Sequence, residues 1–298
     1  MNNPPALVKG DLIRIVAPAK AIDQKLLNAA KSIIEKAGFR VDFGLNANGS
    51  FNYFSGTIAQ RTSDFQAALD DPQVKAILCA RGGYGCIHLV DRLNWAGLLE
   101  NPKWIIGFSD VTVLHQHLTK MNCPSIHGTM PLNFQDNSDR SLSLLFEALK
   151  GEPVNYKWKL SEYNKVGTAE GEVVGGNLAV LCSLIGTKEM PDYQNKILFL
   201  EDVGEHLYAI DRYFFQLAKA GILDQIRGLI LGSFTSLSDT NPPYGKAYEE
   251  IIRSHFDYRN TPLAFNFPAG HQDDNCPLIF GHNAELSVTQ DAVSLAII

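Results

Sequence analysis

Short apolar runs alternate with helix-like stretches over the first 130 residues, and this alternation constrains the fold more than any other feature. The apolar runs are residues 12–18, 40–43, 76–80 and 104–108, and the helical patterns cover residues 23–37, 58–69 and 111–120, with another helix beginning near residue 87. Strands that alternate with helices form βαβ units, in which helices cover both faces of a parallel sheet. The first part of the chain is therefore predicted to be α/β.

The pattern changes after Gly128. Residues 135–170 are polar and rich in Pro and Gly, apart from an amphipathic stretch at 142–149. The second half has apolar runs at 197–200 and 229–231 and a strand-like carboxyl terminus at 285–298, as in an α+β domain. A chain of 298 residues is long enough for two ordinary domains. We predict a first domain at 1–135, a linker or crossover at 136–168 and a second domain at 169–298.

Charge and cysteine usage exclude several classes of protein. The formal net charge is 26 − 32 = −6, so no broad basic surface is expected for nucleic acid or an anionic membrane. The sequence contains neither a signal-peptide-like start nor 18 consecutive apolar residues. The five cysteines include no C-x-x-C pair, which disfavours a zinc knuckle or a disulfide framework. These features predict a cytoplasmic protein with no membrane or nucleic-acid partner.

The strongest chemical signal lies in residues 105–113, Ile-Ile-Gly-Phe-Ser-Asp-Val-Thr-Val. An apolar strand ends at Gly107, so Ser109 falls where the chain turns into a helix, as in a nucleophile elbow. The amide of Asp110 would then point outward at a helix N-terminus, where developing negative charge is stabilised. Both residue types also cap helices routinely. Val111 replaces the last glycine of G-x-S-x-G, which disfavours an ordinary α/β-hydrolase.

A glycine-rich segment, residues 81–85, follows another predicted strand and reads Arg-Gly-Gly-Tyr-Gly. Glycines allow positive φ and a close approach to a ligand, so exposed amides here could hold an anion or an oxyanion. The segment contains neither G-x-G-x-x-G nor G-K-[ST], which excludes a dinucleotide fingerprint and a P-loop. A tight strand-to-helix turn is the alternative. Because Ser109 also follows a parallel strand, we expect both turns at the same sheet edge.

A hydroxyl nucleophile needs a base, and the base needs an acid to orient it. Glu201 and Asp202 follow the apolar run at 197–200 and are candidate acids. His271 follows a Pro-Ala-Gly turn, a loop of the kind that presents a catalytic imidazole, whereas His127 ends a strand-like run and would support the site from behind. The remaining candidates are less suited: surface positions are expected for His88, His206 and His255, and the spacing of His115 and His117 on one helix disfavours a shared metal.

Five segments, in order along the chain, resemble the motifs of the LD-carboxypeptidases, the serine peptidases that include the microcin C7 self-immunity carboxypeptidases. These segments are residues 81–85, 107–110, 175–178, 200–202 together with 210–212, and 268–271. The resemblance implies a Rossmann-like parallel-sheet N-terminal domain and a smaller, β-rich α+β C-terminal domain. It also implies a homodimer that uses no metal and no other cofactor.

The resemblance further implies a Ser-His-Glu triad, with Ser109 as the nucleophile, His271 as the base and Glu201 as the orienting acid. The oxyanion donors would be the backbone amides of Gly83 and Asp110. The family reaction removes a terminal D-alanine from the L-centre of diaminopimelate or lysine in peptidoglycan tetrapeptides, so the implied role is murein recycling. Since the triad residues come from both halves of the chain, we expect the site in a cleft between them.

Substrate contacts are less constrained by the sequence. Arg81, beside the glycine segment, is a candidate for gripping the free carboxylate of the leaving residue through a bidentate fork, although it could equally form a surface ion pair. Tyr84 would line the same cleft or pack against the turn. Asp273 and Asp274 depart from the family pattern. They would either favour the free amine of diaminopimelate or belong to a solvated loop.

Two other functions compete with a murein peptidase. An immunity-type carboxypeptidase that cleaves aminoacyl-nucleotide analogues is the first, although members of that branch tend to be longer than this chain. A non-catalytic module that holds an anion or a peptide on the glycine and serine turns is the second. The presence of Ser109, Glu201 and His271 together argues against such a module, because binding alone does not require all three.

Overall fold

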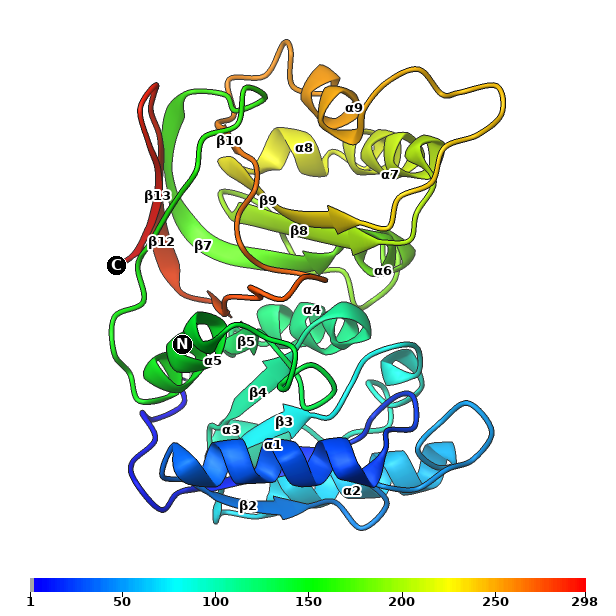
Figure 1. Ribbon diagram of the computed structural model, residues 1–298, viewed down its shortest axis with the longest axis vertical. Coiled ribbons are helices and arrows are strands. Elements are labelled where there is room, and N and C mark those ends of the chain that lie inside the picture. The colour runs from blue at the N-terminus through cyan, green and yellow to red at the C-terminus, as the bar shows by residue number, and fades with distance from the viewer. Residues whose placement is uncertain (1–2) are drawn as a thin grey trace.

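The computed structural model describes residues 3–298, which form two layered halves, one above the other in Figure 1. The first half contains strands β1 (Leu12–Val16), β2 (Arg40–Phe43), β3 (Val74–Cys79), β4 (Trp104–Gly107) and β5 (Ser125–His127), and helices α1 (Gln24–Lys36), α2 (Ile58–Asp70), α3 (Ala96–Glu100) and α4 (Thr112–Lys120). Most of these elements follow the predicted order, with two differences. The helix expected near residue 87 is only a short 3₁₀ turn at Cys86–His88, and α3 was not predicted.

The first sheet has the strand order β11-β5-β4-β3-β1-β2. All pairs from β5 to β2 are parallel, and β11 (Leu278–Phe280) adds an antiparallel edge beside β5. The central strands are almost entirely buried because helices cover both faces, which explains their continuous apolar runs. The α/β prediction is thus confirmed. The edge strand β11, however, comes from the far end of the chain.

Local signals in the sequence fix the ends of the helices in this half. The Asp23 side chain accepts a hydrogen bond from the Lys25 amide and so caps α1. Thr57 and Gln60 form a capping box at the start of α2. At its other end, the buried ammonium of Lys103 donates to the carbonyls of Ala68, Leu69 and Asp71. These carbonyls would otherwise lack partners at the helix C-terminus.

The second half is built on a sheet with the order β10-β9-β8-β7-β12-β13-β6. Strands β7 to β10 pair in parallel, and the remaining pairs are antiparallel. The strands are β6 (Tyr156–Trp158), β7 (Gly167–Asn177), β8 (Ile197–Val203), β9 (Gly228–Thr235), β10 (Leu263–Ala264), β12 (Asn283–Val288) and β13 (Val293–Ile297), and the helices are α6 (Leu178–Ser183), α7 (Leu207–Lys219), α8 (Ile222–Gln225) and α9 (Tyr248–Ser254). Helix α5 (Asp139–Leu149) instead lies beside β5 in Figure 1, and its Leu149 carbonyl accepts the Leu7 amide at 2.7 Å. The strand-like carboxyl terminus is the hairpin of β12 and β13. The predicted α+β character is confirmed.

Strand β7 brings the two halves together, and α4 lies between the two sheets in Figure 1. The Gln116 side chain of α4 donates to the carbonyl of Gly175 at 2.7 Å. Gly176 has a φ of +140°, and a Cβ there would lie 2.3 Å from Thr112 Oγ1. Only glycine allows so close an approach of β7 to α4. The domain boundaries at 1–135, 136–168 and 169–298 stay predictions.

None of the helices in the described part of the chain has the length and apolar character needed to cross a bilayer.

Candidate active site

Ser109 follows β4 directly and opens a 3₁₀ turn, Ser109–Val111, that leads into α4. Its φ is +62°, in the left-handed region that non-glycine residues seldom adopt. Such strain is typical of a site where the fold forces a side chain into a required position. The side chain is only partly buried, so the strand-to-helix turn presents a hydroxyl at the carboxyl edge of the sheet.

His115 supports this turn from inside the protein. Its Nε2 lies 2.8 Å from the carbonyl oxygen of Gly107, and its Nδ1 lies 2.7 Å from the hydroxyl of Ser125. A carbonyl only accepts, so Nε2 carries the proton and Nδ1 accepts from Ser125. Burial lowers the pKa of His115 to about 4 and keeps the ring neutral. This supporting role of His115 was not predicted from the sequence. The one signal for it is the spacing of eight residues between Gly107 and His115, which lie on either side of the turn.

The glycine segment packs directly against the serine turn, as predicted for two turns at one sheet edge. Their strands β3 and β4 are neighbours in the sheet. A Cβ on Gly82 would lie 3.0 Å from Ser109 Cβ and 3.1 Å from Ser109 Oγ, so glycine makes the contact possible. The Asp110 carboxylate accepts the Cys86 amide at 2.9 Å and ties the two turns together. Burial raises the pKa of Asp110 despite this hydrogen bond.

The two predicted oxyanion donors come from these adjoining turns. Gly83 has a φ of +106° and borders the cavity beside Ser109. Within residues 3–298 its amide donates to no other group. The Asp110 amide lies 3.3 Å from the point where a Cβ on Gly82 would stand. Unpaired amides next to a nucleophile can stabilise an oxyanion as charge develops.

His271 and Glu201 form a hydrogen-bonded pair from the second half. His271 Nδ1 lies 2.7 Å from Glu201 Oε2, and the carboxylate is fully buried near the end of β8. Because a carboxylate only accepts, Nδ1 carries the proton and Nε2 keeps its lone pair. Burial tends to lower the pKa of His271, but the charge and hydrogen bond of Glu201 outweigh it and raise that pKa above 6.5.

Close backbone packing holds this pair in place. Gly270 has a φ of +113°, and a Cβ there would lie 2.5 Å from Ser233 Oγ and 2.9 Å from Glu201 Oε2. The Gly270 amide donates to Asn275 Oδ1 at 2.8 Å, which fixes the loop that carries His271. The register of β8 against β9 shifts between Leu200 and Asp202, beside Glu201. Such bulges commonly redirect side chains next to active sites.

One cavity of about 330 Å³ is lined by both Ser109 and His271. Both halves line it, with Arg81, Gly82, Gly83, Phe108, Ser109, Met130, Leu132 and Asn133 from the first and Val203 and His271 from the second. Within residues 3–298 no hydrogen bond joins Ser109 to His271. Catalytic hydrogen bonds in unliganded sites are often long and tighten when the substrate binds. The cavity lies between the halves, as the sequence predicted.

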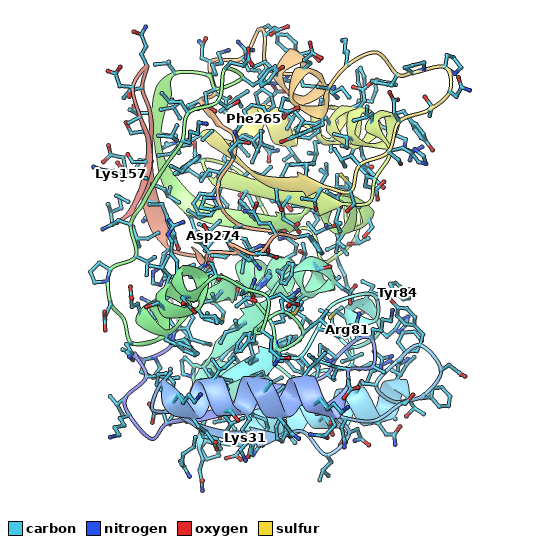
Figure 2. The ribbon with its side chains drawn as sticks, viewed as in Figure 1. Lys31, Arg81, Tyr84, Lys157, Phe265 and Asp274 are labelled. Carbon is cyan, nitrogen blue, oxygen red and sulfur yellow. The ribbon has the colours of Figure 1, made fainter. Side chains whose placement is uncertain are left out.

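Figure 2 shows Arg81 and Tyr84 near one another at the edge of the first half that faces the second. Arg81 Nη1 donates to the carbonyl of Ala21 at 3.0 Å, and its buried Nε has no partner within the described chain. The half-buried guanidinium borders the cavity of Ser109. Tyr84 instead borders a neighbouring hollow of about 460 Å³ and packs edge-on against His88.

The other candidates have structural environments. Asp202 accepts hydrogen bonds from Asn177 Nδ2 and from the amides of Ala179 and Val203, so it organises the start of α6. Burial, reinforced by the charge of Glu201, raises the pKa of Asp202 to about 7. His127 is buried between aromatic rings behind Phe108. The surface position expected for His255 is wrong, because this ring is buried and lies 3.0 Å from Asp211.

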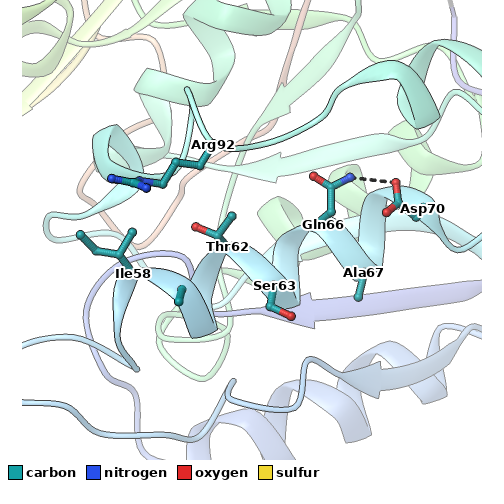
Figure 3. Close-up of a pocket in the computed structure, with 8 residues that line it drawn as sticks. Ile58, Thr62, Ser63, Gln66, Ala67, Asp70 and Arg92 are labelled. Atoms are coloured by element: carbon teal, nitrogen blue, oxygen red, sulfur yellow. Dashed lines mark hydrogen bonds between the residues drawn. The ribbon is translucent and has the colours of Figure 1, made fainter.

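A wider hollow of about 730 Å³ runs along α2, where Arg92 faces Ile58 and Thr62 (Figure 3). The Gln66 amide at its floor donates to Asp70 at 2.8 Å. No predicted site residue borders this groove. Among residues 3–298, no three His, Cys, Asp or Glu side chains gather as a metal site would. The chemistry-bearing residues are therefore concentrated between the halves.

Comparison with known proteins agrees with this arrangement. Residues 13–128 match the family model described as the LD-carboxypeptidase N-terminal domain, and residues 170–286 match the LD-carboxypeptidase C-terminal domain. A putative carboxypeptidase of Synechocystis sp. is 35% identical over 95% of this chain and 93% of its own length. The murein tetrapeptide carboxypeptidase of Pseudomonas aeruginosa is 31% identical over 92% of both chains.

Solved structures show the same fold. The muramoyltetrapeptide carboxypeptidase from Oxalobacter formigenes superposes with a TM-score of 0.89 at 28% identity, covering 96% of this chain and 98% of that one. A microcin C7 self-immunity protein in complex with adenosine monophosphate superposes with a TM-score of 0.88 at 21% identity, covering 98% and 97%. The latter likeness concerns the fold alone. This chain belongs to the LD-carboxypeptidase family and is a serine carboxypeptidase.

Proposed function

We propose that this protein removes the terminal D-alanine from peptidoglycan tetrapeptides by acyl transfer through Ser109, and that it serves murein recycling. The observation that carries the proposal is the shared cavity, which the strained Ser109 lines together with His271, the imidazole bonded to Glu201. The relatives named for murein tetrapeptides, which match nearly the full length of the chain, support this substrate class.

In the proposed mechanism His271 Nε2 takes the proton of Ser109 as Oγ attacks the carbonyl carbon of the scissile amide. Glu201 holds the Nδ1–H in place and stabilises the imidazolium that forms. The tetrahedral intermediate then collapses, and His271 delivers the proton to the departing amine of D-alanine. Water, activated by the same imidazole, hydrolyses the acyl-enzyme and regenerates Ser109.

The amides of Gly83 and Asp110 are proposed to stabilise the oxyanion of the intermediate. Their position beside Ser109 at the end of two parallel strands supports this role. Loss of one oxyanion donor typically costs about 2.7–4 kcal/mol of transition-state stabilisation. Tyr84 is proposed to contact the substrate at the outer rim, since it belongs to the glycine segment and half of its surface is exposed.

Mass spectrometry of products tests the proposed substrate class. The purified protein would be incubated separately with L-Ala-D-Glu-meso-diaminopimelate-D-Ala and with an aminoacyl sulfamoyl nucleoside. We expect loss of one alanine from the tetrapeptide and no cleavage of the nucleoside. Cleavage of the nucleoside alone would establish the immunity-type activity instead. No cleavage of either compound would favour an anion- or peptide-binding module.

Arg81 is proposed to bind the free carboxylate of the leaving D-alanine. An unpaired buried Nε on a guanidinium that borders the cavity supports this role. Arg81→Lys should raise KM about tenfold, because lysine cannot form the bidentate fork. Arg92→Lys, in the separate groove along α2, is the matched control and should leave KM and kcat unchanged. Steady-state kinetics in which Arg81→Lys matches the wild type would refute this role.

The resemblance to the family also leads us to propose a homodimer in the cytoplasm. Sedimentation velocity should give a mass of twice 32.9 kDa. A monomer at every concentration tested would overturn the dimer. Fractionation of the producing cells would test the location, with recovery alongside a cytoplasmic marker as the expected result.

A further inference from the structure

A second hollow, of about 210 Å³, adjoins the catalytic cavity on the other side of His271. The two spaces have Phe108, Asn133 and His271 in common, so a substrate in one can extend into the other. The second hollow is further lined by Asp136, Asn137, Gly270, Gln272, Asp273 and Asn275. We call it the acidic side pocket, because it contains two carboxylates and no Lys or Arg.

The carboxylates of Asp136 and Asp273 are available to a ligand. Within residues 3–298 neither side chain forms an ion pair, and both residues are exposed. The neighbouring Asp274 differs, because its carboxylate accepts the Ser138 hydroxyl at 2.6 Å and pairs with Arg140 at 2.7 Å. The two members of the unusual acidic pair therefore have different roles. Asp274 anchors the loop to the start of α5, and it lies between the two halves in Figure 2.

The position of Asp273 is fixed through its own backbone. Its carbonyl oxygen accepts the Ser138 amide at 2.9 Å and the Asn137 side-chain amide at 2.8 Å. These bonds hold the loop that follows His271 against the segment that carries Asp136. Asp136 and Asp273 are thus carried on two segments that are bonded to one another beside one hollow. Two neighbouring carboxylates that lack a cationic partner in the described chain attract an ammonium group.

A second, independent feature of the pocket points to a polar ligand. Asn275 is only 1% exposed and borders the pocket, yet its Nδ2 has no hydrogen-bond partner in the described chain. The side-chain orientation is fixed, because Oδ1 accepts the Gly270 amide at 2.8 Å. Nδ2 is therefore a donor that lacks an acceptor. A buried donor without a partner costs free energy unless a ligand satisfies it.

We propose that the acidic side pocket binds the free amino-acid end of a substrate side chain, the ammonium between Asp136 and Asp273 and the carboxylate on Asn275 Nδ2. This side chain belongs to the residue that supplies the scissile carbonyl. The inference rests on the proposed function, since it concerns the third residue of the tetrapeptide. It makes the pocket the determinant that selects diaminopimelate, whose side chain ends in such a centre, over residues with a simpler side chain.

Three tetrapeptides that differ only at the third residue test this selectivity. Diaminopimelate offers the ammonium and the carboxylate, lysine offers the ammonium alone, and norleucine offers neither. For the wild type, kcat/KM should fall in that order. In the double variant Asp136→Asn with Asp273→Asn, kcat/KM should drop about 5- to 10-fold for the first two peptides and stay unchanged for norleucine. Added salt should lower kcat/KM for the same two peptides and leave that of the norleucine peptide unchanged.

The double variant Glu285→Gln with Asp291→Asn, at two exposed positions of the β12–β13 hairpin, is the matched control for net charge and should change none of the three rates. Equal losses on all three peptides, or no loss on any, would overturn the side-pocket inference while the proposed function stands. A wild type that releases alanine from none of the peptides would instead overturn the proposed function, and the inference with it.

Discussion

At the scale of single residues, the chemistry depends on the 2.7 Å hydrogen bond between His271 and Glu201. This contact opposes the desolvation of the imidazole and raises the pKa of His271. A general base acts in its neutral form, so activity should fall as the pH drops through a value above 6.5. Asp202, next to Glu201 and with a pKa of about 7, ionises in the same range. The midpoint of the fall in activity therefore belongs to His271 and Asp202 as a coupled pair, and not to His271 alone.

Glu201→Gln removes the charge that raises the pKa of His271. Burial then dominates, so the acid limb of the kcat/KM profile should move to lower pH. The rate at the plateau should fall by about 10²- to 10⁴-fold, because the imidazole loses its orienting and stabilising partner. The profiles of wild type and variant provide the measurement, with Glu170→Gln on the exposed part of β7 as the control. An unchanged midpoint in Glu201→Gln would contradict the assignment.

The individual site residues differ in how far the sequence reveals them. Ser109 and the glycine segment follow apolar runs directly, so local sequence is enough to indicate them. Glu201 and His271 emerge from the family motifs, because nothing near either residue in the sequence specifies its partner. His115 and Asn275 were missed. Their roles depend on hydrogen bonds to Gly107 and Gly270 that arise only after the chain has turned.

At the scale of elements, the site is made by three close approaches of backbone. Gly82 allows the glycine segment to touch Ser109, Gly176 allows β7 to touch α4, and Gly270 allows the histidine loop to touch Glu201. A fourth glycine, Gly232 on β9, lies where a Cβ would stand 2.5 Å from the carbonyl oxygen of Ala269. Each approach brings two segments of the chain closer together than a side chain at the glycine would allow.

Gly270→Ala tests whether this close packing positions the His271–Glu201 pair. The new Cβ would lie 2.9 Å from Glu201 Oε2, so the carboxylate or the histidine loop must shift. We expect kcat to fall by about 100-fold, the cost of a displacement on the order of 1 Å. Gly245→Ala is the matched control, because Gly245 also has a positive φ but has open space around it. Equal activity of the two variants would show that Gly270 does not position the site.

Most strands and helices of the first half were predictable because an apolar pattern encodes each of them, with side-chain caps at α1 and α2. The five-residue helix α3 was missed. The pairing of β11 with β5 was not predictable, since an edge strand of three residues carries no signal of its partner. Strand β7 was also missed, because its first residues alternate polar and small side chains and resemble a linker. Contacts of this kind depend on the tertiary arrangement and not on local preference.

At the scale of the whole molecule, the two halves are joined by shared structure. β11 completes the first sheet from the far end of the chain, and α4 packs against β7 of the second. Tyr193 of the second half donates to Gln116 of the first at 2.6 Å, within a buried contact. Relative motion of the halves would break these contacts. The catalytic cavity therefore depends on the integrity of both.

We expect both halves to unfold in one transition, because neither sheet is independent of the other. Trp95 and Trp104 report on the first half and Trp158 on the second. In urea, the Trp fluorescence and far-UV circular dichroism curves should coincide. Trp158→Phe confines the fluorescence signal to the first half and should leave its midpoint equal to that from circular dichroism. Two separate midpoints would contradict the expected coupling.

The central claim is that Ser109 is a nucleophile activated by His271. Peptide mapping by mass spectrometry, after reaction with a serine-directed fluorophosphonate, tests this claim most directly. The account predicts a single modified residue, Ser109, and a strong reduction of labelling in His271→Ala. Labelling of another serine, or labelling of Ser109 that is unchanged in His271→Ala, would contradict it.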